Sequence, residues 1–242
     1  LDTVWITVDR TLYLWDYSMP IEENCVYVYR GICDVILGIT LATPQSGVFP
    51  GNVKYLLIVQ TQSNIEIHSI SVKSTKRGID VSQTDFVVAT PSHTFNSIAC
   101  SQKGRIFLAC SDGNLYELVY SNDEATWASY FGLDFAKKAK LVRHGSFSTE
   151  GLISMLPFFD SIRDTSRAEN SSYPIKYDMS VSISHLLIDD LRSVLYTFSV
   201  GGILSVYHTG LDGKATNLCF RASILEKVNS WKNGAQNKEF NH

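Results

Sequence analysis

Four segments of this chain repeat one pattern, in which two β-rich runs flank a short polar or glycine turn. They are VWITVDRTLYLWDY (4–17), YLLIVQTQSNIEIHSI (55–70), RIFLACSDGNLYELVY (105–120) and VLYTFSVGGILSVYHT (194–209). The turns fall at Asp9-Arg10, Ser63-Asn64, Asp112-Gly113 and Gly201-Gly202. Asp-Gly and Gly-Gly supply the positive φ angles that tight hairpins require. The repeat therefore predicts four antiparallel hairpins.

A further short strand is predicted ahead of each of the last three hairpins, in VILGITLA (35–42), TFNSIACS (94–101) and VSISHLLI (181–188). A unit of three or four antiparallel strands that recurs about every 50 residues is typical of a propeller blade and not of a helical solenoid. We expect an all-β chain, a β-propeller of the seven-bladed type that is incomplete here, with its blades in residues 1–214. A β-sandwich is the alternative, although a sandwich has no reason to keep a fixed repeat.

The third and fourth hairpins are separated by a longer interval, which must contain an insertion, a degenerate blade or both. We interpret it as an inserted loop at about residues 122–180. It opens with a basic cluster, Lys137, Lys138, Lys140 and Arg143. Small uncharged residues then alternate with large apolar ones, namely Phe147, Leu152, Ile153, Met155, Leu156, Phe158, Phe159 and Ile162.

The apolar part of this loop has two interpretations. Leu152, Met155, Leu156 and Phe159 stand at helical spacing, which aligns them on one face. Large apolar side chains opposite small uncharged ones are typical of a helix that lies in a membrane interface, and nearby cations strengthen contact with anionic lipid. Internal packing is the alternative, because Pro157 interrupts a helix.

Residues 215–242 are expected to form a C-terminal helical segment or linker, because the strand pattern ends after Gly210. One amphipathic helix is predicted over residues 222–234, where Ile224, Leu225, Val228 and Trp231 stand at helical spacing before Gly234. This helix either packs across the propeller or enters the groove of a partner.

Nothing in the sequence predicts catalysis. HExxH, GxSxG, GxxxxGK[ST] and glycine-rich strand-to-helix motifs are absent, and the six histidines lie apart from one another and from cysteine. His68 and His208 fall within strands, where a structural role is expected. Asp189-Asp190 is a paired carboxylate, but it falls where a turn joins two strands, and Asp favours turns. We therefore predict no catalytic residue, cofactor, metal or small-molecule substrate.

Charge, cysteine content and hydropathy exclude some kinds of partner and cellular location. The net charge is −3 with scattered Lys and Arg, so the basic patch that nucleic-acid binding requires is missing. The five cysteines are odd in number and form no CxxC pair, which predicts reduced thiols in an intracellular compartment. No long apolar run or secretory signal occurs, so neither a membrane span nor secretion is expected.

Four stretches resemble, in order, successive parts of the N-terminal β-propeller of the large inner-ring scaffold nucleoporins, the non-FG type in which a propeller precedes an α-helical solenoid. They are LYLWDY, TPQSGVFPGNVKYLLIVQTQSNIEI, GRIFLACSDGNLYELVY and LIDDLRSVLYTFSVGGILSVYHTG. The third is the most specific, since a Trp-Asp pair such as that of LYLWDY occurs in many propeller repeats.

The resemblance implies a non-enzymatic scaffold of the nuclear pore complex, in the nuclear envelope, that docks other nucleoporins. It also implies that the Ser-rich apolar segment of the inserted loop touches the pore membrane. A propeller adaptor of a vesicle coat or another cytosolic assembly is the alternative, and a propeller-based hydrolase ranks third.

Overall fold

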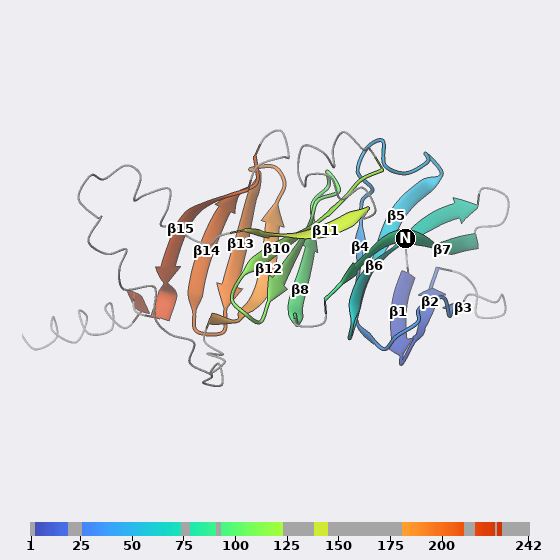
Figure 1. Ribbon diagram of the computed structural model, residues 1–242, viewed down its shortest axis with the longest axis horizontal. Coiled ribbons are helices and arrows are strands. Elements are labelled where there is room, and N and C mark those ends of the chain that lie inside the picture. The colour runs from blue at the N-terminus through green and yellow to red at the C-terminus, as the bar shows by residue number, and fades with distance from the viewer. Residues whose placement is uncertain are drawn as a thin grey trace, which may run out of the picture.

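The computed structural model describes residues 3–18, 26–73, 78–90, 93–122, 138–144, 181–210, 216–225 and 227–228. Within these residues, fifteen strands form four antiparallel sheets that stand in a row (Figure 1). Neighbours along the chain are neighbours in each sheet, so every sheet is an up-and-down meander. This is the blade architecture that the repeat predicts, and the sheets are called blades 1 to 4 in chain order.

The strands divide among the blades as follows. Blade 1 contains β1 (Thr3–Val8), β2 (Thr11–Asp16) and β3 (Val26–Tyr29). Blade 2 contains β4 (Ile36–Ala42), β5 (Val53–Thr61), β6 (Asn64–Lys73) and β7 (Gly78–Ala89). Blade 3 contains β8 (Phe95–Cys100), β9 (Ile106–Cys110), β10 (Leu115–Tyr120) and β11 (Ala139–His144). Blade 4 contains β12 (Ile183–Asp189), β13 (Val194–Ser199), β14 (Ile203–His208) and β15 (Asn217–Ser223).

All four predicted hairpins are confirmed, as β1–β2, β5–β6, β9–β10 and β13–β14. Their turns use the left-handed backbone region where the sequence offered residues for it. Gly113 has a φ of 83°, Gly202 a φ of 77° and Asp9 a φ of 51°. The short strands expected before the last three hairpins are β4, β8 and β12.

Two strands lie where an inserted loop and a C-terminal helical segment were predicted. β11 falls inside the predicted inserted loop of residues 122–180, and it pairs with β10 as the last strand of blade 3. β15 begins after residue 214, where the blades were expected to end, and it pairs with β14. Both corrections have one cause: β10 and β14 each have a second edge of backbone N–H and C=O groups, which a fourth strand satisfies.

The core lies between the blades. Leu12 and Tyr29 of blade 1 pack with Leu57 of blade 2, whereas Leu56, on the opposite face of the same strand, packs with Ile106 of blade 3. Phe107 and Ala109 of blade 3 pack with Leu195 and Tyr207 of blade 4. A sheet that is covered on both faces reads as a continuous apolar run, which accounts for the composition of β5.

Candidate functional site

The edge strand β11 carries the part of the predicted basic cluster that the structure describes. Lys138 precedes the strand, and its Nζ forms an ion pair of 2.7 Å with Oδ2 of Asp85 on β7. Lys140 and Arg143 are exposed on the strand. Because strand side chains alternate, these two residues project from opposite faces. The cluster is therefore divided, with Lys138 engaged between blades 2 and 3.

The rest of the predicted membrane contact lies outside the described residues. This applies to Lys137 and to all eight apolar positions between Phe147 and Ile162. Their contact with a membrane stays a prediction. In the described part of the chain, no helix is both long and apolar enough to cross a membrane.

The C-terminal segment begins against blade 4. Residues 224–225 and 227–228 are helical, and because β15 continues to Ser223, the helix begins two residues later than predicted. The backbone N–H of Ile224 donates to the carbonyl of Gly202 at 2.9 Å. A Cβ on Gly202 would lie 2.6 Å from Cγ of Leu225, so this leucine covers the β13–β14 turn. Val228 is half-buried, and Trp231 lies outside the described residues.

The two end blades present apolar faces. On blade 1, the face away from blade 2 exposes Val4, Ile6, Trp15, Val26 and Val28. The register sets Val4 opposite Trp15 and Trp15 opposite Val26, so one row crosses all three strands. On blade 4, the face away from blade 3 exposes Leu187, Phe198 and Phe220, with Lys227 Nζ 5.6 Å from the centre of the Phe220 ring. This composition is typical of sheets that are covered on both faces.

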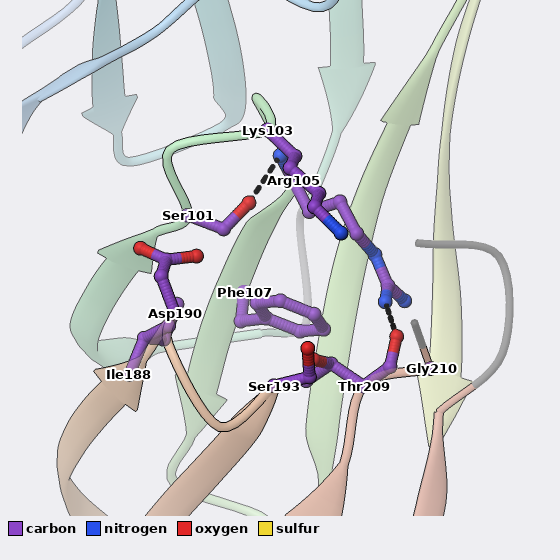
Figure 2. A pocket seen from close by; sticks show the side chains of 9 residues that line it. All are labelled: Ser101, Lys103, Arg105, Phe107, Ile188, Asp190, Ser193, Thr209 and Gly210. Atoms are coloured by element: carbon purple, nitrogen blue, oxygen red, sulfur yellow. Dashed lines mark hydrogen bonds between the residues drawn. The ribbon is translucent and has the colours of Figure 1, made fainter. Parts of the chain in front are cut away.

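A buried ionic network lies where blade 3 meets blade 4, and Figure 2 shows its Arg105 beside Thr209 of blade 4. Nε and Nη2 of Arg105 donate to the two carboxylate oxygens of Glu117 at 2.7 and 2.8 Å. Nε2 of His144 lies 2.8 Å from the same carboxylate. Arg105 also reaches blade 4, where it donates to the carbonyl of Thr209 and to Oγ1 of Thr216. The guanidinium thus joins the blades.

The charge of Glu117 is stabilised despite its burial. Burial by itself raises the pKa of a carboxyl group. Hydrogen bonds from His144 and Arg105, together with the charge of these groups, outweigh that effect and hold the pKa of Glu117 below its ordinary value. No local sequence pattern indicates this network, because His144 lies 27 residues from Glu117.

The pocket beside Arg105 is too small for a substrate. Ser101, Phe107, Asp190 and Ser193 are among its lining residues, and its volume of about 10 Å³ admits roughly one water molecule (Figure 2). Oδ2 of Asp190 accepts a hydrogen bond of 3.0 Å from the backbone of Gln102 on blade 3. Asp189, the last residue of β12, forms an ion pair with Arg192. The acidic pair therefore lies where β12 passes into the turn to β13, as predicted.

A second buried network joins blades 1 and 2. The hydroxyl of Tyr29 lies 2.9 Å from Nδ1 of His68, whose Nε2 lies 3.0 Å from Oε2 of Glu66. His68 is fully buried, in agreement with its expected structural role. Burial, followed by the charges of Tyr27 and Glu66, raises the pKa of Tyr29 to about 12. Among the residues described, no group of three or more His, Cys, Asp or Glu is placed to hold a metal ion.

Comparison with known proteins identifies the family. The nucleoporin N-terminal family model, described as Nup133 N terminal like, matches residues 1–241. The chain belongs to this nucleoporin family. The resemblance found in the hairpin sequences is thereby confirmed.

Curated nucleoporins match most of this nucleoporin chain. Nuclear pore complex protein Nup154 of Drosophila melanogaster is 27% identical over 84% of the chain and 13% of its own length. Nucleoporin NUP170 of Chaetomium thermophilum is 26% identical over 88% of the chain and 14% of its own length. The chain thus spans only about a seventh of the length of these relatives. Their names agree with the expected place at the nuclear pore complex.

A solved structure has the same fold. The crystal structure of the Chaetomium thermophilum Nup170 N-terminal domain with Nup53 matches with a TM-score of 0.65 and 22% identity, over 91% of this nucleoporin chain and 27% of that chain. The likeness confirms the predicted all-β, propeller-type class.

Proposed function

We propose that this chain is a scaffold domain of the nuclear pore complex that docks other nucleoporins. The observation that carries the proposal is the family match over residues 1–241. The related Nup170 domain was solved together with Nup53, which supports a docking role for a domain of this fold. Docking of other nucleoporins is favoured over a vesicle-coat role because the curated relatives are nuclear pore proteins by name.

The blade junctions suit a docking platform. Arg105 links blade 3 to blade 4, the Tyr29–His68 contact links blade 1 to blade 2, and the hydroxyl of Tyr120 links blade 2 to blade 3 through the backbone of Gln45 and Gly104. Buried polar contacts that are fully paired rigidify the groups they join. Neighbouring blades are thereby held in fixed relation, so a partner meets a preformed surface.

Two measurements test docking. A fluorescent fusion of the chain, expressed in cells of its source organism, is expected at the nuclear rim; a distribution on cytoplasmic vesicles would favour the coat adaptor. Calorimetric titration of the purified chain with the Nup53-type nucleoporin of the same organism is expected to show saturable binding. Absence of both rim localisation and binding would contradict the proposal.

We further propose that residues 146–162 contact the pore membrane. The support is the apolar composition of this segment and its position directly after β11, whose Lys140 and Arg143 are exposed. Burying a Leu, Met or Phe side chain contributes about 1.5–3 kcal/mol, and a cation near anionic lipid about 1 kcal/mol. Ordering the segment opposes these terms, which leaves weak contact that many copies in one assembly strengthen.

Liposome flotation tests this contact. The native chain is expected to float with small, highly curved liposomes, and the double variant Phe158→Asp, Phe159→Asp is expected to stay in the dense fraction. Phe198→Asp is the matched control, because it makes the same change at an exposed phenylalanine of blade 4, outside residues 146–162. Circular dichroism verifies that each variant folds. Equal flotation of all three proteins would contradict a membrane role for the segment.

A further inference from the structure

A pocket of about 170 Å³ lies between blades 2 and 3. Its walls are residues 37–40 of β4, Gln60 of β5 and residues 95–98 of β8. None of these residues carries a formal charge, and Thr40, Asn96 and Ser97 add polar groups to the lining. The pocket is therefore suited to a neutral ligand with hydrogen-bonding groups, and not to a phosphate, a metal ion or a carboxylate.

Gln60 is the unusual residue of this pocket. Only 5% of its surface is exposed, and its side chain lines the pocket without a hydrogen bond to any described residue. Gly38 stands opposite it in the register, and a Cβ on this glycine would lie 3.8 Å from Oε1 of Gln60. The amide atoms of Gln60 are not sealed off from solvent, because among the described residues only Thr3 Oγ1 is a side-chain polar atom that is both sealed and without a partner. The donor and acceptor of Gln60 are thus open to a group that enters the pocket.

Two strand edges border the same space. β4 is the first strand of blade 2 and β8 the first strand of blade 3; among the described strands each pairs on one side only, and the two contact each other. An open edge has backbone N–H and C=O groups that an extended peptide can pair with. The side chain of Asn96, which also lines the pocket, is held in place because its Nδ2 donates to Oγ of Ser182 and to the carbonyl of Ile183 at 2.9 Å each.

We propose that this pocket binds an extended, uncharged segment of a partner polypeptide through the backbone of that segment. A carboxamide has one donor group and one acceptor side by side, so Gln60 matches the N–H and C=O of a peptide. The open edges of β4 and β8 supply further backbone pairing. The absence of a Cβ at Gly38 leaves room beside Oε1 of Gln60 for the incoming peptide. This site rests on its own geometry and is independent of the nuclear pore assignment.

The test is a nuclear magnetic resonance titration of the ¹⁵N-labelled chain with N-acetyl-triglycine methylamide, a probe that consists of peptide backbone alone. The side-chain NH₂ signals of Gln60 and backbone signals of β4 and β8 are expected to shift saturably. Gln60→Met keeps the length of the side chain and removes its hydrogen bonds, so it is expected to weaken binding about tenfold. Gln83→Met, the same change at an exposed position of β7, is expected to have no effect.

A second variant covers the case in which Gln60→Met does not fold. Gly38→Ala adds a methyl group at an ordinary contact distance from Gln60 and fills part of the pocket, so it is expected to weaken binding while the fold is kept. The proposal is overturned if the probe causes no saturable shift, which would leave the pocket to water. It is equally overturned if binding is unchanged in both Gln60→Met and Gly38→Ala.

Discussion

Arg105 and Glu117 form a two-pronged ion pair in the interior, and the pair directs the guanidinium of blade 3 toward the backbone of blade 4. The side chains are only 5% and 9% exposed. Arg105 also lies over the ring of Phe107, 4.8 Å from its centroid. A charge in this position is tolerated only while its partners are present.

Replacing Glu117 by Gln is expected to lower the free energy of unfolding by about 3–5 kcal/mol, because it removes the buried charge to which both Arg105 and His144 are bonded. Urea denaturation followed by circular dichroism measures this loss. Asp85→Asn is the control, since it removes an acid from an exposed pair with Lys138 and is expected to leave the midpoint unchanged. Similar midpoints for native chain and Glu117→Gln would contradict the importance of the pair.

The contribution of Glu117 is expected to depend on pH with a defined sign. Its pKa in the folded state lies below the ordinary value of 4.5, so the folded chain favours the ionised form. Above that value the full stabilisation is present. As the pH falls below it, the unfolded state takes up a proton first, and the stabilisation is lost. The difference in unfolding free energy between native chain and Glu117→Gln should therefore shrink in acid; a difference that grows would refute the assignment.

Alanine substitutions at three glycines distinguish the cost of backbone strain from the cost of steric crowding. Gly113 has a positive φ, and a Cβ there would lie 2.9 Å from the carbonyl oxygen of Val181 on the way into blade 4. Gly47 has the same φ of 83° with nothing within 4 Å, and Gly51 has open space without a positive φ. Alanine at position 47 is expected to cost about 1–2 kcal/mol, alanine at 113 more, and alanine at 51 nothing. Thermal unfolding midpoints rank the three, and equal losses at 47 and 113 would argue against a tight junction at Val181.

The four described cysteines are expected to react in two groups. Burial raises the pKa of the Cys100 thiol to about 12 and that of the Cys110 thiol to about 11, whereas Cys33 and Cys219 are exposed. Since the thiolate is the reactive form, a short iodoacetamide pulse at pH 8 should label only Cys33 and Cys219 among these four described cysteines. Peptide mass spectrometry locates the label. Fast labelling of Cys100 or Cys110 before denaturation would show that their blade opens.

The hairpins were predictable because their signals are local. Asp112-Gly113 and Gly201-Gly202 indicate a turn within two residues, and the apolar runs beside them indicate the strands. β11 and β15 gave no such signal. β11 carries Lys140 and Arg143, as edge strands often do, and this resembled a basic loop. Most side chains of β15 are exposed, so its place depends on backbone pairing that composition does not reveal.

The buried networks were not predictable, because blade packing brings their members together from distant positions. Tyr29 and His68 are 39 residues apart, and the sequence around one residue does not indicate contact with the other. Gln60 did leave a trace. It interrupts the apolar run of β5 on the face that meets blade 3, where an uncharged polar side chain is uncommon.

The apolar end faces have a consequence for how the chain is made. Each blade covers one face of the blade before it, while its own far face stays exposed until another blade packs on it. A ribosome delivers the blades in order, N-terminal first. During synthesis the growing chain therefore exposes the apolar far face of blade 1 together with that of its newest blade, and correct assembly depends on the next sheet covering the newest face before another molecule binds it.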